Sequence, residues 1–495
     1  MKRDPDGPAA FRRRPPEQPL KSNGPTMETP LEPGSFGSDS YLLVPDRLLL
    51  PEGVVEDHAV VVSAGTFRDI GPKDAVTARH RQLRPLALPG KLLMPGFIDA
   101  HHHLTQTFGK ALAFGEPSEI FRRVWVPLEG ALDTELVYLA AKAAALEALR
   151  GGFTAVVDAG TRAPGDIGAI ARGTREAGLR TVLGLICNDA APDADRQAIR
   201  QRAESFLGEW SGDGLVRPSL AISIPEAASD RMLQDISRMA ADAGVIFQTH
   251  VNEHLVAVER SLVDCGRRPL EHLSHLGALG PQVLVAHSTL VTPGELMMLR
   301  DTDTAVAYNP VASQWKGNAV APAAMMKSLG IRFGIGTDGT RSDGFRLVDA
   351  AEATQRIAFG LGTGDSCCGA GWTWLDHATS AGADAAGIGG ITGRIETGKE
   401  ADFLLVDIDT PEFSPSWDLV WELVRLGNRD QIVGVFVAGK LRLWQGWPTD
   451  WDGRALMREV SRRAGAAVGA APIKRVHSGS TAHRAAARQQ SEFAE

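Results

Sequence analysis

The chain has 495 residues and a formal net charge of −8, and 43% of its residues are hydrophobic and 23% charged. This composition is typical of a soluble globular protein, and the length allows one barrel-sized domain with a smaller one, or about three average domains. The excess of acidic residues argues against nucleic acid or an anionic membrane as the main partner, and without an apolar run of about 18 residues no membrane span is expected.

Cysteine usage and the N-terminal segment predict a cytoplasmic protein. The four cysteines have no CxxC spacing and are too few to form a disulfide framework for so long a chain, which favours a reducing compartment. Residues 12–14 are arginines, as in the charged part of an export signal, but a polar, proline-rich segment follows instead of an apolar one.

Both ends of the chain differ in texture from its middle. Residues 1–39 and 478–495 lack hydrophobic periodicity and are expected to be a disordered leader and tail. Residues 40–91 and 391–447 contain short apolar runs broken by turn residues, which is typical of small β-sheets. We therefore expect a β-sandwich built from both ends of the chain, followed by a helical extension at 448–477.

Residues 92–390 predict an α/β domain with eight βα units, the size of a (β/α)8 TIM barrel. The clearest helix is 134–150, which ends at Gly151 and Gly152. Continuous apolar runs are typical of strands that are buried on both faces. Eight such runs recur, at 92–99, 153–158, 181–187, 217–224, 245–250, 282–287, 304–309 and 332–338.

Histidines and carboxylates follow four of these runs, at the strand ends where a TIM barrel carries its catalytic residues. The first run leads into His101, His102 and His103, and the others lead into His250 with Glu253, His287, and Asp338. Imidazole and carboxylate suit Zn²⁺ or Fe²⁺, and a catalytic site leaves one coordination position open for water. A lone HxH is also found in surface clusters, but four matching strand ends favour a metal site.

Spacing separates the roles of these residues. Side chains alternate along an extended segment, so His101 and His103 share a face and His102 points away. Glu253, three residues after His250, is placed to act as a general base without binding the metal, although a solvated loop carboxylate would look the same. The pattern Gly334-x-Gly336-x-x-Gly339 resembles a dinucleotide fingerprint, but it follows the last strand of eight rather than opening a doubly wound sheet.

The segments PGFIDAHHH, THVNE, AHS and GTDG resemble the metal-dependent amidohydrolase superfamily. The resemblance covers about 40–445 and is strongest to the mononuclear branch, which includes cytosine, guanine, 8-oxoguanine and adenosylhomocysteine deaminases and the triazine hydrolases. It implies that His101, His103, His250 and Asp338 bind one metal ion, most simply Zn²⁺ with Fe²⁺ as the alternative. It also implies that Glu253 is the acid/base and that His287 contacts the attacked group or its water.

Substrate contacts are less specific. Gln106 matches a base-binding glutamine of the purine deaminases, and Trp125 and Glu129 lie in a segment that resembles the family's lid, although Trp125 could equally serve packing. Strand-end position alone adds further candidates, namely Asn188, Asn309, Trp315 and Arg341. No lysine ends strand 4, which favours one metal over two, although Glu226 can in principle bridge a second.

The expected reaction is attack by a metal-activated water on an sp² carbon, with Glu253 moving the proton, His287 stabilising charge and Asp338 helping to relay a proton. The expected substrate is a small aminated N-heterocycle that loses ammonia. One alternative is cleavage of an exocyclic urea, carbamate or amide, or of a ring carbon–halogen bond. Another is a catalytically silent binding subunit, which the intact ligand set disfavours. The resemblance implies a homodimer or larger homo-oligomer.

Overall fold

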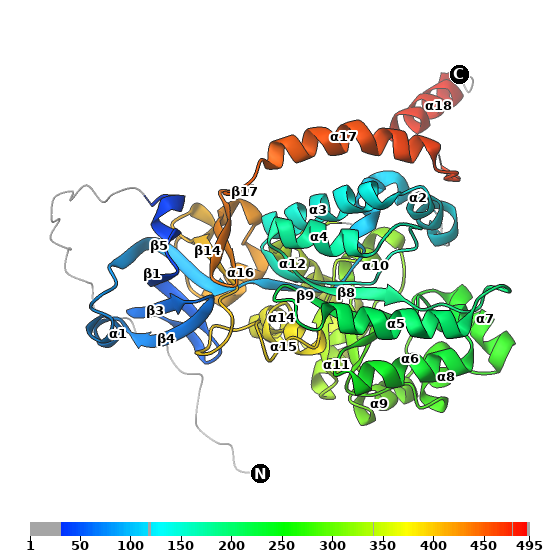
Figure 1. The fold of residues 1–495 in the computed structure, drawn as a ribbon, viewed down its shortest axis with the longest axis horizontal. Coiled ribbons are helices and arrows are strands. Elements are labelled where there is room, and N and C mark those ends of the chain that lie inside the picture. The colour runs from blue at the N-terminus through cyan, green and yellow to red at the C-terminus, as the bar shows by residue number, and fades with distance from the viewer. Residues whose placement is uncertain (1–30, 117–119, 340, 478, 493–495) are drawn as a thin grey trace, which may run out of the picture.

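The computed structural model describes residues 31–116, 120–339, 341–477 and 479–492, and it contains two β-sheets (Figure 1). The first is an eight-stranded parallel sheet in which the strands are ordered as in the sequence, β6 to β13. The backbone N–H of Asp338 donates to the carbonyl of His101 at 2.9 Å, which joins the last strand to the first. The predicted TIM barrel is therefore confirmed.

All eight predicted apolar runs overlap a barrel strand. These strands are β6 (Phe97–His102), β7 (Phe153–Asp158), β8 (Arg180–Ile186), β9 (Val216–Ala221), β10 (Phe247–Val251), β11 (Val283–His287), β12 (Ala305–Tyr308) and β13 (Phe333–Ile335). Their side chains are almost all buried, because helices cover the outer face and the inner face fills the barrel.

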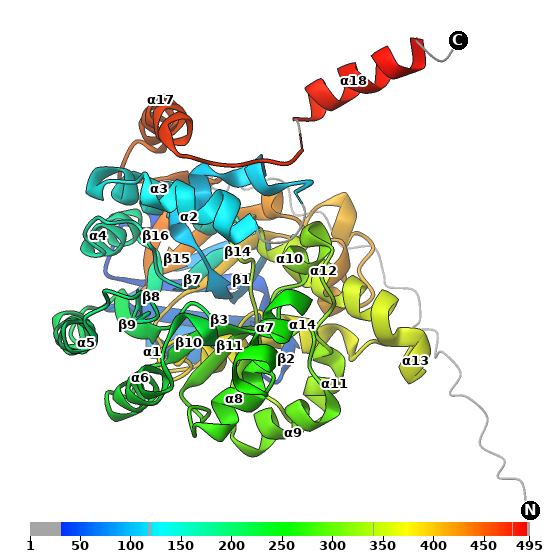
Figure 2. The ribbon, with the colours of Figure 1, turned by 90° about the vertical axis from the view of Figure 1, so that its right-hand side faces the viewer.

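Helices surround the barrel on all sides (Figure 2). The predicted helix 134–150 is α3 (Thr134–Arg150), which begins where the Asp133 side chain accepts a hydrogen bond from Leu136 N and which is rich in alanine and leucine, the best helix formers. The others include α4 (Gly168–Ala177), α5 (Arg196–Trp210), α6 (Asp230–Asp242), α7 (Leu255–Cys265), α8 (Pro269–His275), α9 (Pro293–Asp301), α10 (Pro310–Lys316), α11 (Ala323–Ser328), α12 (Gly344–Gln355), α14 (Ala370–His377) and α15 (Ser380–Ala385).

The second sheet is built from both ends of the chain, as expected. Strand β5 pairs with β1 on one side and antiparallel with β14 on the other, which joins the N-terminal and C-terminal parts. Phe36, Phe403 and Phe436 pack together in its core, and the last two rings stack at 4.2 Å. Its strands are β1 (Ser40–Leu50), β2 (Gly53–Val55), β3 (His58–Ser63), β4 (Thr66–Pro72), β5 (Pro85–Pro95), β14 (Phe403–Asp407), β15 (Ile432–Val437), β16 (Lys440–Trp444) and β17 (Trp447–Pro448).

Two boundaries differ from those expected. The run 92–99 is divided at Gly96, so that 92–95 belong to the second sheet and only the residues from Phe97 onward to the barrel. A side chain at Gly96 would collide with Thr154, so only glycine allows the close crossing there. Residues 480–492 form helix α18 (Ser480–Glu492) instead of irregular chain, because alanine, arginine and glutamine favour helix even without a buried face.

The C-terminal extension lies over the barrel. Helix α17 (Gly453–Ala470) runs along α3, whereas α18 extends away from the barrel (Figures 1 and 2). Residues 471–477, here called the C-terminal strap, then reach the segment after β6: Lys474 N donates to Arg123 O at 2.9 Å, and Val476 N donates to the Glu116 carboxylate at 2.8 Å. Among the described residues, none of the helices has the length and apolarity that crossing a bilayer requires.

Candidate metal centre

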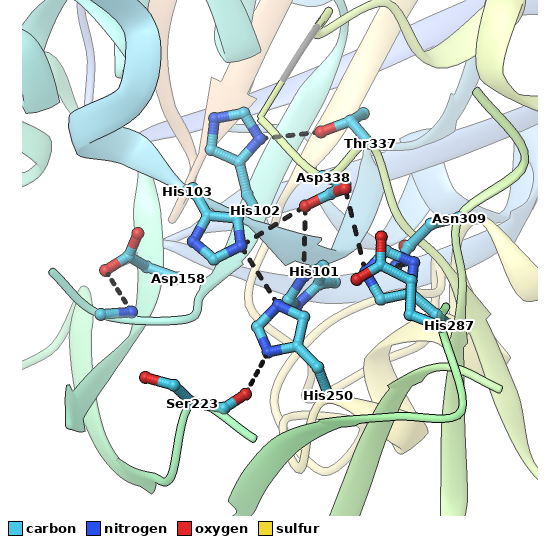
Figure 3. Close-up of polar contacts among 12 residues, drawn as sticks. His101, His102, His103, Asp158, Ser223, His250, His287, Asn309, Thr337 and Asp338 are labelled. Carbon is cyan, nitrogen blue, oxygen red and sulfur yellow. Dashed lines mark hydrogen bonds and ion pairs between the residues drawn. The ribbon is translucent and has the colours of Figure 1, made fainter. Parts of the chain in front are cut away.

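Four side chains meet at the carboxyl end of the barrel (Figure 3). The Oδ1 atom of Asp338 lies 3.5 Å from Nε2 of His101 and 3.4 Å from Nε2 of His103. Nε2 of His250 lies 3.3 Å from Nε2 of His103. All four residues are buried or nearly so: His101 lies on β6 and His103 directly after it, His250 lies on β10, and Asp338 lies in the turn after β13. The structure thus brings together the four side chains that the sequence predicted as ligands.

The spacing of these atoms fits one metal ion. A tetrahedral ion with bonds of about 2.1 Å would hold its ligand atoms about 3.4 Å apart, which is the separation of these three pairs. Nε2 of His101 is buried without a hydrogen-bond partner, as expected of an atom whose lone pair binds a cation. Three imidazole nitrogens and one carboxylate oxygen form a donor set that suits Zn²⁺ and Fe²⁺.

Neighbouring groups fix the ligands in place. Nδ1 of His250 donates to the carbonyl of Ser223 at 2.7 Å, so its Nε2 keeps the lone pair that faces the centre. His102 points away from the ligands, as predicted, and its Nδ1 lies 2.7 Å from Oγ1 of Thr337 and 3.2 Å from Asp99. Asp99 in turn accepts from Thr337 N at 2.9 Å, which anchors the residue beside Asp338.

Asp338 itself adopts a backbone conformation that few residues favour. Its φ is +58°, and in this left-handed region a non-glycine residue is held by its surroundings at a cost of about 1 kcal/mol or more. The flanking glycines serve this turn: a side chain at Gly336 would collide with Asn309 and His101, and one at Gly339 would press on His103. Close packing against the ligands therefore accounts for both glycines, and the pattern is not a dinucleotide site.

His287 lies beside the four predicted ligands rather than among them. Its Nε2 lies 3.9 Å from Oδ2 of Asp338, and distance alone would allow His287 to bind an ion together with His101, His250 and Asp338. Its Nδ1, however, accepts from the Asn309 amide at 3.3 Å, which leaves the proton on Nε2. That N–H faces Glu253 at 3.6 Å and Asp338 at 3.9 Å. Burial lowers the pKa of His287 to about 3, so it donates as neutral imidazole.

Glu253 lies between His287 and the ammonium group of Lys316. Its Oε2 faces His287, and its Oε1 lies 2.7 Å from Nζ of Lys316, which also lies 2.6 Å from Oδ2 of Asp338. Burial alone would raise the pKa of the Glu253 and Asp338 carboxyls, but the surrounding positive charge outweighs it and holds both pKa values well below their usual range. The same carboxylates raise the pKa of Lys316 against the effect of its burial. Both carboxylates are therefore ionised.

A cavity of about 390 Å³ opens onto these groups. Three of the predicted substrate contacts line it: Gln106, Trp125 and Asn188. Its remaining wall is largely apolar and includes Ile120, Phe121, Val126, Val251 and Val256. The wall and the metal centre together enclose a flat, small molecule better than a peptide or polymer.

Four other predicted contacts lie behind the cavity wall or away from it. Glu129 is fully buried and pairs with Arg162 at 2.7 Å. Asn309 lies behind His287, to which it donates. Trp315 packs on Phe114 with ring centroids 5.4 Å apart, and Arg341 is half exposed and faces Asp343 at 3.6 Å. The position of a residue near a strand end did not show whether its side chain faces the cavity.

Among the cavity residues that the sequence reasoning missed are two cations, Lys316 and Arg162. Lys316 is the neighbour of Trp315, and Arg162 follows the end of β7 by four residues. Arg162 also contacts Ser223 Oγ at 3.4 Å and lies over the Phe121 ring at 4.2 Å. Both residues lie in loops or helices that follow barrel strands, so their position in the sequence could have marked them as candidate site residues. The sequence did not show which residues they would contact.

Comparison with known proteins agrees with this fold. The model of the amidohydrolase family matches residues 92–442. The 5-methylthioadenosine/S-adenosylhomocysteine deaminase of Nitratidesulfovibrio vulgaris is 30% identical over 414 residues, which are 82% of this chain and 92% of the relative. The crystal structure of an adenosine deaminase from Xanthomonas campestris with bound zinc aligns with a TM-score of 0.79 and 26% identity, over 86% of this chain and 98% of that one. The guanine deaminase of E. coli, 18% identical, shares the fold with a TM-score of 0.70 over 82% of this chain and 100% of its own.

Proposed function

The chain belongs to the amidohydrolase family, and we propose that it is a metal-dependent deaminase that releases ammonia from an aminated N-heterocycle. One observation carries this proposal: four potential ligand atoms lie around one cavity at about the spacing that a tetrahedral ion requires. An ionised carboxylate, Glu253, and a neutral imidazole, His287, lie beside them. The names of its relatives, which are deaminases of adenosine derivatives, support a purine-like ring.

His101, His103, His250 and Asp338 would hold the ion, and zinc is our preferred metal because the Xanthomonas campestris structure contains it. When bound, a divalent ion in such a site lowers the pKa of a water molecule toward neutrality and so provides the nucleophile. Glu253 accepts the proton of that water through Oε2, the oxygen that faces His287. Nε2–H of His287 then donates to the group on which negative charge develops.

Collapse of the addition product needs a proton on the departing nitrogen. Glu253 returns the one that it took, so the carbon–nitrogen bond breaks and ammonia leaves. Asp338, hydrogen-bonded through Oδ2 and beside His287, helps to relay that proton. Trp125 and Phe121 provide flat apolar surface for the ring, and Gln106 and Asn188 provide its polar contacts.

The experiment is a substrate screen with the released amine identified. Purified enzyme is stripped of metal, restored with Zn²⁺ or Fe²⁺, and incubated with aminopurine nucleosides, aminopurines, pterins, triazines and arylureas. We expect metal-dependent ammonia release from an aminated heterocycle, abolished by Glu253→Gln with metal still bound. Release of a larger amine or of halide instead of ammonia would contradict deamination but would still agree with a metal-dependent hydrolase.

We also propose that the enzyme is a cytoplasmic homodimer or larger homo-oligomer with a small molecule as its partner. Its four free cysteines and its resemblance to the amidohydrolases support these proposals. Light scattering coupled to size-exclusion chromatography measures the oligomeric state directly.

A further inference from the structure

Lys316 is a buried cation beside both reactive carboxylates. It is the last residue of α10, the helix that follows strand β12, and Gly317 ends that helix with a φ of +69°. Only 10% of its side chain is exposed, and it lines the cavity together with Glu253 and Asp338. A lysine is seldom buried unless its charge is compensated, so its position calls for a specific partner.

The ammonium group contacts one oxygen of each carboxylate. Nζ lies 2.7 Å from Oε1 of Glu253 and 2.6 Å from Oδ2 of Asp338. The second oxygen of each carboxylate points elsewhere: Oδ1 of Asp338 faces His101 and His103, and Oε2 of Glu253 faces His287. Each carboxylate thus has one oxygen that binds Lys316 and one oxygen that faces the histidines of the site.

The two carboxylates depend on Lys316 to different degrees. Oε1 of Glu253 has two further donors, Nε2 of His254 at 3.1 Å and the Asn318 amide at 3.3 Å. Oδ2 of Asp338 has no comparably close second contact among the described residues, because Nε2 of His287 is 3.9 Å away. The position of Oδ2 of Asp338 therefore depends mainly on Lys316, whereas Oε1 of Glu253 is held by three residues.

We propose that Lys316 is a positioning residue for the reaction: its ammonium ties Oδ2 of Asp338 to Oε1 of Glu253, so that Asp338 offers a single oxygen to the metal ion and Glu253 keeps Oε2 free for the attacking water. This inference rests on the proposed function for its effect on turnover. Its effect on the ligand Asp338 depends only on the geometry. Without the ammonium, Oδ2 can turn toward the ion beside Oδ1 and raise the coordination number.

The test compares three variants in the full-length protein loaded with Co²⁺, whose visible bands weaken as coordination rises above four. Lys316→Met removes the charge at similar length. Asn318→Ala removes a contact to Glu253 only. Lys91→Met removes the ion pair with Asp407 at 3.1 Å in the second sheet, which is a control for the loss of a partly buried lysine.

We expect Lys316→Met to retain one ion per chain, to weaken the cobalt bands, and to lower kcat about 10- to 100-fold with KM nearly unchanged. Asn318→Ala should leave the cobalt spectrum unchanged, and Lys91→Met should change neither quantity. A wild-type cobalt spectrum in Lys316→Met, or a changed spectrum with unchanged kcat, would overturn the proposal. If Lys316→Met does not fold, Lys316→Gln, which keeps a donor without the charge, is measured in its place.

The spectrum separates this proposal from the proposed function. If the wild-type enzyme releases no ammonia from any substrate, deamination fails, but the cobalt bands of Lys316→Met still report whether the ammonium holds Asp338 to one oxygen. If ammonia is released and the bands do not change, only the role of Lys316 is lost.

Discussion

The carbonyl oxygen of Ser223 accepts a hydrogen bond from Nδ1 of His250 at 2.7 Å, and this contact links the end of strand β9 to a metal ligand on β10. Ser223 is itself held by Asn188: the Asn188 amide donates to Ser223 Oγ at 3.0 Å, and Ser223 N donates to Asn188 Oδ1 at 2.9 Å. Asn188, which follows β8, and Ser223, which follows β9, thus orient the imidazole of His250 on β10.

Asn188→Ala should therefore weaken metal binding without removing a ligand. Loss of a residue that orients a ligand typically costs about 10- to 100-fold in metal affinity, and we expect about 10-fold here because the Ser223 carbonyl itself remains. Competition with a chromophoric chelator measures the dissociation constant. Asn428→Ala, which removes a helix cap far from the barrel end, is the control, and equal affinities in the two variants would contradict the role of Asn188.

Asn309 determines which ring nitrogen of His287 carries the proton. Its amide donates to Nδ1, so replacing it by a carboxylate in Asn309→Asp should draw the proton to Nδ1 and turn Nε2 into an acceptor. We expect kcat to fall about 100-fold or more while the metal stays bound, because the wrong tautomer cannot donate to developing negative charge. Steady-state kinetics with metal analysis checks this result. Asn309→Ala, which leaves the tautomer free to choose, should be less impaired than Asn309→Asp.

Arg180 couples the barrel to the second sheet. It is 1% exposed, and its guanidinium binds Asp402 at 2.8 and 3.1 Å. Arg180→Met leaves the Asp402 carboxylate buried without its partner, which should reduce the free energy of unfolding by about 3–5 kcal/mol. Chemical denaturation measures it. The double variant Arg180→Met/Asp402→Leu should recover part of that loss, and a double variant less stable than the single one would contradict this explanation.

Glu116 fastens the C-terminal strap to the segment that carries Trp125. Its carboxylate accepts from Val476 N and His477 N and pairs with Arg123 at 2.7 Å. Burial opposes its ionisation, but these bonds, led by that from Val476, lower its pKa from 4.5 to about 2. A carboxyl group whose pKa is lower in the folded state contributes stability above its unfolded pKa, and this contribution is lost as the pH falls.

The stability difference between wild type and Glu116→Gln should therefore be constant above about pH 5 and should shrink as the pH falls from 4.5 toward 2. At neutral pH we expect a loss of about 1–3 kcal/mol, because buried donors are left poorly paired. Thermal unfolding at several pH values measures the difference. A difference that grows on acidification would contradict the assignment of the low pKa to Glu116.

Much of the fold could be predicted because its signals are local. Eight apolar runs indicated eight strands, and the helical pattern of 134–150, ended by Gly151 and Gly152, placed α3. The boundary at Gly96 could not be predicted, because it depends on the approach of Thr154 from a strand 58 positions later. The helix at 480–492 was not predicted, because a helix without a buried face carries no hydrophobic periodicity.

The convergence of the proposed metal ligands was predictable for a similar reason. In a parallel barrel every strand ends at the same rim, so residues at strand ends converge whatever their distance in sequence. Residues further along each loop do not obey that rule. Glu129 and Trp315 turned from the cavity while Arg162 and Lys316 faced it, because each loop folds according to partners that other strands supply.

The sequence by itself determined the barrel, the sheet assembled from both chain ends, and the convergence of the histidines and aspartate that we propose as ligands, because hydrophobic patterning and strand-end position are properties of the chain alone. Only the tertiary structure decided which oxygen of Asp338 faces the histidines, which nitrogen of His287 carries the proton, and that Lys316 lies between two carboxylates. Those choices depend on hydrogen-bond partners far apart in sequence, and distance and direction between them exist only once the chain has folded.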